Sequence, residues 1–123
     1  MITEDYVSFE TAKLLKEKGF SAFVHYYYDK YGELLYTIIT KQNMDSGSTY
    51  IICPTLQMTM KWLREVHNIY VEVSINEKLQ FGWSIHRSVN NSLYFSANSK
   101  DVSYTTHEQA CEAAVKYCLE NLI

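Results

Sequence analysis

In residues 69–87 the chain reads IYVEVSINEKLQFGWSIHR. Up to residue 75, and again from residue 79, branched and aromatic residues alternate with polar residues. A period of two is typical of strands that bury one face, and the polar turn Asn76–Lys78 separates the two runs. The stretch predicts a β-hairpin of Ile69–Ile75 and Leu79–Arg87. We expect its apolar face to be buried with leucines of three helices; these core residues are Ile69, Val71, Val73, Phe81, Trp83, Ile85, Leu15, Leu63 and Leu119.

Three other segments have the spacing and the terminal residues of amphipathic helices. They are Phe9–Lys18, Leu56–His67 and His107–Leu122. The first lies between Ser8, a predicted N-cap, and Gly19, which suits the left-handed position after a helix. The second is preceded by Thr55, another predicted N-cap. Thr106 and Gln109 form a predicted capping box before the third helix.

The remaining strands are shorter. Ala22–Tyr28 and Leu34–Thr40 flank the turn Asp29–Gly32 and are predicted to form a hairpin, while Ser92–Ser96 continues the second hairpin. A polar loop, Gln42–Ser48, follows the first hairpin. The order α-ββ-α-βββ-α predicts an α+β fold with an antiparallel sheet of about five strands and three helices mainly on one face. Thr49–Ile52 is a short extra strand before the second helix. With 123 residues, a single globular domain covering 1–123 is expected.

Composition excludes several classes of function. The formal net charge is −3, and basic residues form no long block, so duplex nucleic acid is not an expected partner. No apolar run reaches the length of a membrane span, and the first residues do not resemble a signal peptide, so a cytoplasmic location is expected. The three cysteines, Cys53, Cys111 and Cys118, lack metal-binding spacing and are predicted to be free thiols.

Catalytic and metal-binding motifs are absent from the sequence. The four histidines lie on different predicted elements without HxH or HExxH spacing. Neither a GxSxG nucleophile motif nor a glycine-rich phosphate loop occurs. We therefore expect no enzyme activity, no metal and no cofactor, although paired carboxylates in a small enzyme of unknown type are a second alternative.

Aromatic residues are the main compositional signal of function, because the chain holds 11 tyrosines. Alternation places Tyr26 and Tyr28 on one side of their strand, and we expect one such side to lie away from the helices, together with Tyr36. Tyr70 and His86 lie on the polar sides of their strands. Cross-strand pairing that only stabilises the sheet is the structural alternative. The predicted binding residues are Tyr26, Tyr28, Tyr70, His86 and Arg87.

The three helical blocks also carry a family resemblance. They read FETAKLLKEKGF (9–20), PTLQM (54–58) followed by KWLREVH (61–67), and ACEAAVKYCL (110–119). In these blocks the chain resembles a group of small uncharacterised proteins from phages and mobile elements of Bacteroides-type gut bacteria. The resemblance implies a genomic context. It carries no functional residues over, because the group has no assigned activity.

Within that context two functions compete. The first is a non-enzymatic accessory protein that binds another protein and self-associates through the sheet that carries Tyr26, Tyr28 and Tyr36. The alternative is a counter-defence protein that sequesters a nucleotide signal, a small planar ligand that aromatic residues and a cation such as Arg87 or Lys78 would bind.

Overall fold

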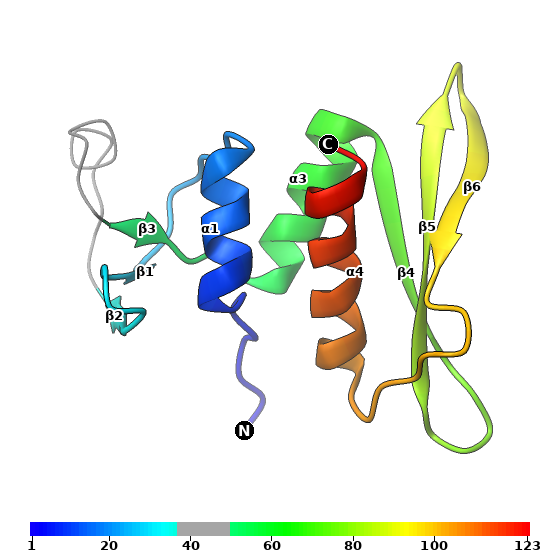
Figure 1. Ribbon diagram of the computed structural model, residues 1–123, viewed down its shortest axis with the longest axis horizontal. Coiled ribbons are helices and arrows are strands. Elements are labelled where there is room, and N and C mark those ends of the chain that lie inside the picture. The colour runs from blue at the N-terminus through cyan, green and yellow to red at the C-terminus, as the bar shows by residue number, and fades with distance from the viewer. Residues whose placement is uncertain (37–49) are drawn as a thin grey trace. The chain divides into compact units, whose positions relative to one another are not determined.

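The computed structural model describes residues 1–36 and 50–123, which group into two compact units, Met1–Thr55 and Leu56–Ile123 (Figure 1). Each unit combines helix with a three-stranded antiparallel sheet, so the predicted α+β class is confirmed. The prediction of a single globular domain stays a prediction. None of the helices in the described residues has the length and apolar character needed to cross a bilayer.

The first unit contains helix α1 (Phe9–Glu17) and the sheet β2-β1-β3. Helix α1 begins as predicted, because the Ser8 hydroxyl accepts a hydrogen bond from the Thr11 amide at 3.2 Å. Gly19 follows the helix with φ of 82°, a backbone conformation that glycine adopts without strain. Helix α1 packs against β3.

The first strand of this unit is shorter than the predicted Ala22–Tyr28. The three strands are β1 (Tyr26–Tyr28), β2 (Leu34–Tyr36) and β3 (Ile51–Ile52), and β1 pairs with both others. The β1–β2 turn is held by the Asp29 carboxylate, which accepts hydrogen bonds from the amides of Tyr31 and Glu33 at 2.9 and 3.0 Å. The predicted loop Gln42–Ser48, and the predicted strand residues 37–40 and 49, lie outside the described residues.

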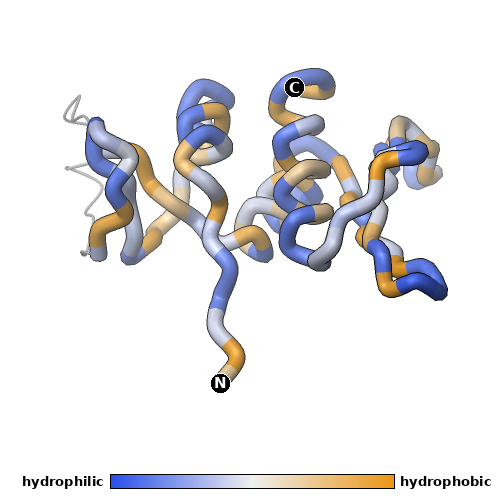
Figure 2. Tube along the Cα trace, turned by 60° about the horizontal axis from the view of Figure 1, so that its bottom comes forward, coloured by the Kyte–Doolittle hydropathy of each residue, from blue (hydrophilic) through white to orange (hydrophobic). Residues whose placement is uncertain are grey.

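The second unit contains the hairpin quoted above. Its sheet is β4 (Ile69–Ile75), β5 (Phe81–Val89) and β6 (Ser92–Asn98), in sequence order. Helices α3 (Leu56–His67) and α4 (His107–Asn121) lie on one face of this sheet (Figure 1). The predicted capping box of Thr106 and Gln109 is present at the start of α4. Both helices carry hydrophilic and hydrophobic positions along their length (Figure 2).

The predicted orientation of the central strands is confirmed. Ile69, Trp83 and Ile85 are buried beneath the helices, as are Leu63 and Leu119, and Leu15 is buried in the first unit. The side chains of Tyr70, Glu72 and Ser74 are exposed. Full burial of Val71, Val73 and Phe81 was expected, but these three are only half-buried. Val71 and Val73 belong to β4, an edge strand, which has a neighbouring strand on one side only.

The predicted single sheet of about five strands is wrong, because six short strands form two separate sheets in the described residues. The short strand β3 pairs with β1, which gives the first unit a sheet of its own. Strand β4 then starts a second sheet by pairing with β5. Alternation of apolar and polar residues indicates which side of a strand is buried, but it does not identify the partner strand.

Candidate functional site

The five predicted binding residues lie in two different sheets. Tyr26 and Tyr28 belong to β1, whereas Tyr70 lies in β4, and His86 and Arg87 lie in β5. Only the last three thus share a sheet, and the role of all five residues in binding stays a prediction.

Tyr26 and Tyr28 pack within the first unit. The Tyr28 hydroxyl donates a hydrogen bond to the Val7 carbonyl at 2.7 Å, and its ring meets Phe9 edge-on with 5.3 Å between ring centroids. The Tyr26 ring lies 4.6 Å from that of Tyr6. Burial of Tyr6, together with the neighbouring Tyr26 ring and Glu4, raises the pKa of its phenol. These rings form the aromatic packing that was the structural alternative for this strand.

In the second unit, His86 and Arg87 point to opposite faces of the sheet. Tyr70 lies opposite His86 in the β4–β5 register, and the His86 ring is 5.8 Å from that of Phe95 in β6. This row lies on the face away from the helices. Arg87 points to the helix-covered face, where its guanidinium donates a hydrogen bond to the Leu122 carbonyl at 3.2 Å. Arg87 therefore holds the C-terminal end of α4 and does not share a face with His86.

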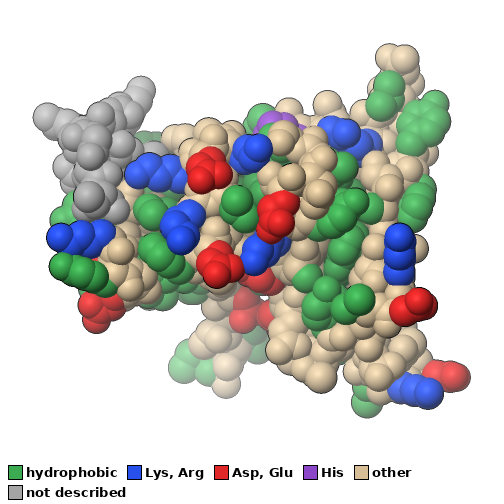
Figure 3. Space-filling model, viewed as in Figure 1, with side chains coloured by type: hydrophobic (Ala, Val, Ile, Leu, Met, Phe, Trp, Pro, Cys, Tyr) green, Lys and Arg blue, Asp and Glu red, His purple; other side chains and the backbone are tan. Residues whose placement is uncertain are grey.

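The β5–β6 hairpin exposes apolar side chains. Leu93, Tyr94 and Phe95 are 60%, 57% and 60% exposed, and Val89 is also exposed. Hydrophobic side chains are visible on the surface where this hairpin lies (Figure 3). The two asparagines at its tip, Asn90 and Asn91, both have positive φ, as a two-residue turn of twisted strands requires.

The loop Ser99–Ser103 follows β6 and is held by hydrogen bonds to β5. The Ser99 amide donates to the Trp83 carbonyl at 2.9 Å, and the Trp83 amide donates to the Ser99 hydroxyl at 3.1 Å. Beyond the loop, Tyr104 and Phe81 exchange two backbone hydrogen bonds of 2.8 and 2.9 Å. The segment after β6 therefore stops pairing with β5 at Ser99 and pairs with β5 again at Tyr104.

Inside this loop the backbone is held in an unusual conformation. Lys100 has φ of 52°, and its amide donates to the Asn98 side-chain oxygen at 2.9 Å. The Val102 amide donates to the Ser99 carbonyl at 3.0 Å. A left-handed residue other than glycine costs of the order of 1 kcal/mol and persists only where its surroundings impose it. The loop thus presents Lys100 in a defined position.

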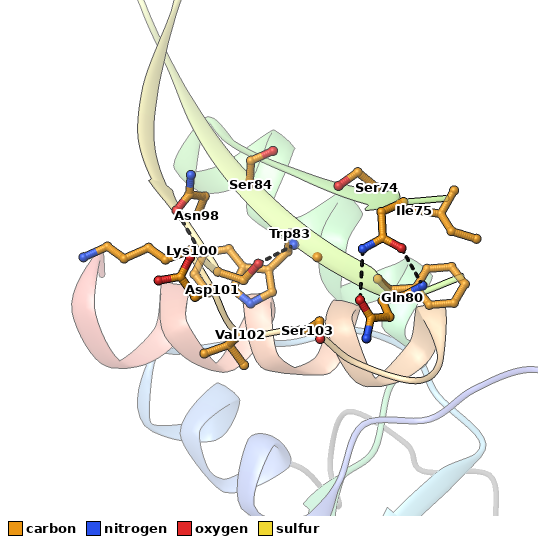
Figure 4. Close-up of a pocket in the computed structure, with 14 residues that line it drawn as sticks. Ser74, Ile75, Gln80, Trp83, Ser84, Asn98, Lys100, Asp101, Val102 and Ser103 are labelled. Carbon is orange, nitrogen blue, oxygen red and sulfur yellow. Dashed lines mark hydrogen bonds between the residues drawn. The ribbon is translucent and has the colours of Figure 1, made fainter. Parts of the chain in front are cut away.

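Two cavities adjoin the loop and share Trp83 and Lys100 among their lining residues. The first has a volume of about 430 Å³ and is mostly polar (Figure 4). Among the residues that line this cavity, Ser74 and Ser84 point away from α4, whereas the Trp83 side chain points towards α4 (Figure 4). Gly82 also lines this cavity, and a Cβ there would lie only 3.0 Å from the Ser99 hydroxyl. The close approach of the loop to β5 therefore favours glycine at this position.

The second cavity, which we call the aromatic cavity, has a volume of about 720 Å³. Trp83, Tyr104 and Tyr117 line it, and the Trp83 and Tyr117 rings are 5.2 Å apart. Trp83 is only 7% exposed, and its indole Nε1 has no hydrogen-bond partner among the described residues. Lys100 is the only charged residue in the lining.

Sequence reasoning missed the residues of the aromatic cavity. Trp83 was assigned to the core, as its buried side chain confirms, but the free indole donor could not be read from alternation. Tyr117 lies on α4, whose pattern indicated packing alone. One signal was present: the turn-forming run 98–101, Asn-Ser-Lys-Asp, ends three residues before the aromatic Tyr104.

Possible metal ligands and thiols can be located in the described ranges 1–36 and 50–123. Those residues contain no group of three or more His, Cys, Asp or Glu that could hold a metal ion. Cys53, Cys111 and Cys118 are buried free thiols there, as predicted. Burial raises the pKa of Cys118 to about 12, and the Arg87 cation opposes this rise.

Comparison of the chain with protein-family models, with curated proteins and with solved structures found no match. The resemblance to phage and mobile-element proteins stays an expectation. Assignment of a site therefore rests on geometry alone.

Replacing Ser99 by alanine should lower the free energy of unfolding of the second unit by about 1–3 kcal/mol. The substitution removes the acceptor of the Trp83 amide, and a donor left without a partner in a part-buried position loses this much. Urea unfolding followed by circular dichroism measures the effect. Ser96→Ala, at an exposed position of β6, is the matched control and should change stability by less than about 0.5 kcal/mol. Equal stabilities of the two variants would contradict the prediction.

Proposed function

We propose that this chain is a non-enzymatic accessory protein that acts by binding protein, and that its binding surface is strand β6. Strand β6 ends its sheet, so its outer edge faces no further strand of the described residues. Unpaired edge strands offer a row of backbone donors and acceptors to another chain. The apolar exposure of Leu93, Tyr94 and Phe95 on this edge is the observation that carries the proposal.

The composition of β6 favours pairing. Proteins usually protect an edge strand with proline or with a charged residue, most often lysine. The sequence of β6, SLYFSAN, contains none of these. An edge strand of seven residues without such protection is suited to an added strand, which gains main-chain hydrogen bonds along its whole length.

The occupant that we propose is β6 of a second copy. A strand without charge can lie beside itself in antiparallel orientation without repulsion between like charges. Two copies related by a twofold axis would then share one sheet of six strands, and closed twofold symmetry is the commonest form of a homo-oligomer. This proposal moves the self-association surface from the tyrosines of β1 to β6, because Tyr26 and Tyr28 are engaged within their own unit.

Light scattering over a range of protein concentrations tests this proposal. We expect the mass to rise from 14.4 kDa towards twice that value. Phe95→Glu places a charge on the edge and should raise the dimer dissociation constant by roughly tenfold, or about 1.4 kcal/mol. Val66→Glu is the matched control, since Val66 on α3 is 58% exposed.

The control should dimerise like the unmodified protein. A monomeric mass at all concentrations up to about 1 mM would overturn self-association. At that concentration only a dimer whose free energy of association is weaker than about 4 kcal/mol escapes detection. A dimer that Phe95→Glu and Val66→Glu weaken equally would place the interface elsewhere than β6.

A further inference from the structure

The unpartnered indole of Trp83 calls for an explanation beyond packing. An indole Nε1–H is a donor only, and a buried donor without an acceptor lowers stability. Trp83 is 7% exposed and lines the aromatic cavity. His67 Nε2 is likewise without a partner among the described residues, but His67 lines neither cavity described above. Of the two atoms, only the Trp83 donor therefore belongs to a residue that lines a cavity. The Nε1 atom itself has almost no accessible surface, so an acceptor reaches it only when a neighbouring side chain shifts.

The walls of the aromatic cavity suit a flat ring. Tyr104 and Tyr117 contribute to the lining, and the Tyr117 ring is inclined by 43° to that of Trp83 at 5.2 Å. Aromatic side chains bind planar ligands by offset stacking and edge contacts. The volume of about 720 Å³ lies in the range of small-molecule sites, which combine apolar walls with a few polar groups.

The charge of the lining is one-sided. Lys100 is its only charged residue, and the neighbouring Asn98 and Ser99 are neutral donors and acceptors. Hydrogen bonding fixes the backbone of Lys100 in a left-handed conformation. The loop therefore defines the point from which the Lys100 side chain extends. A single cation at the rim of an aromatic cavity favours an anionic group on the ligand.

From these observations we propose that the aromatic cavity binds a planar heteroaromatic anion of the nucleotide class. The base packs against Tyr104 and Tyr117. A shift of the side chains that cover Trp83 Nε1 lets this donor bind one acceptor atom of the base. The phosphate lies at Lys100. Trp83, Lys100 and Tyr117 lie outside β6, whereas residues 95–98 of β6 also line the cavity. Lys100→Ala distinguishes this inference from the proposed self-association, because it changes the cavity and leaves β6 intact.

Nuclear magnetic resonance of the ¹⁵N-labelled full chain tests this proposal directly. The chain holds two tryptophans, Trp62 and Trp83, and thus gives two indole N–H signals, which the variant Trp62→Phe assigns. Adenosine, guanosine, cytidine and uridine 5′-monophosphates are titrated in turn. We expect at least one of them to shift the Trp83 signal in a saturable manner while the Trp62 signal stays in place.

Two lysine variants separate a built site from general attraction of anions. Lys100→Ala should raise the dissociation constant of the bound nucleotide by about tenfold, because it removes the one cation of the lining. Lys78→Ala, in the exposed β4–β5 turn, should leave it unchanged. Titration with inorganic phosphate should not move the Trp83 signal to the same extent.

Three results would overturn the inference. In the first, no nucleotide moves the Trp83 signal at millimolar concentration. In the second, inorganic phosphate alone reproduces the shift, so the base has no part in binding. In the third, Lys100→Ala and Lys78→Ala bind the nucleotide with the same affinity as the unmodified chain. The unmodified protein is used for the first two, so that neither depends on a variant that fails to fold.

Discussion

Replacing Leu119 by alanine should lower the free energy of unfolding of the second unit by about 2–5 kcal/mol. Leu119 lies in α4 and is fully buried. The substitution removes buried apolar atoms and leaves a cavity that the surroundings fill only in part. Because a domain of this size has a total stability of about 5–15 kcal/mol, the loss is a large share of it.

Urea unfolding monitored by circular dichroism measures this change. Glu120→Ala is the matched control, since Glu120 neighbours Leu119 on α4 but is exposed. The control should alter stability by less than about 0.5 kcal/mol. A loss below about 1 kcal/mol for Leu119→Ala would show that the α4 side of the sheet is not the core of this unit.

Local signals in the sequence were sufficient for most elements. The alternation of residues 69–75 predicted β4 with its observed ends, and the spacing of Leu56–His67 predicted α3. Capping also acts locally: Ser8 and Thr106 each accept from an amide three residues ahead. These interactions join residues close in sequence, so the pattern contains both partners.

The pairing of strands depends on distant residues, and there the sequence was insufficient. Strand β3 has only two residues, Ile51 and Ile52, and no alternation that would indicate a face or a partner. Its pairing with β1 nevertheless decides that the first unit has a sheet of its own. Such a choice depends on distant contacts such as the packing of α1 against β3, which a short apolar run does not encode.

Prediction of the site was limited by geometry in two ways. His86 and Arg87 are neighbours in β5, and successive residues of a strand point to opposite faces of the sheet. The two side chains therefore cannot belong to one surface. The aromatic cavity was harder to foresee. The packing of α4 on β5 brings Tyr117 next to Trp83, and the loop Ser99–Ser103 adds Lys100.

Between pH 9 and pH 12, stability should fall with rising pH in a way that depends on Cys118. Burial raises the pKa of this thiol from its usual 9.0 to about 12. In this window the unfolded chain has lost the thiol proton whereas the folded chain retains it. The unfolded state therefore binds fewer protons, and the free energy of unfolding decreases as the pH rises.

The size of this effect follows from the separation of about three pH units between the two states, which corresponds to roughly 4 kcal/mol once both have ionised. Tyrosines also ionise in this range, so the comparison must be made with Cys118→Ala at each pH. Stability of the unmodified protein relative to this variant should be constant below pH 8 and should decline from pH 9 upward. Parallel curves for the two proteins across the whole range would mean that the Cys118 thiol ionises in the folded protein as it does in the unfolded chain, and that the helix-covered face around α4 admits water.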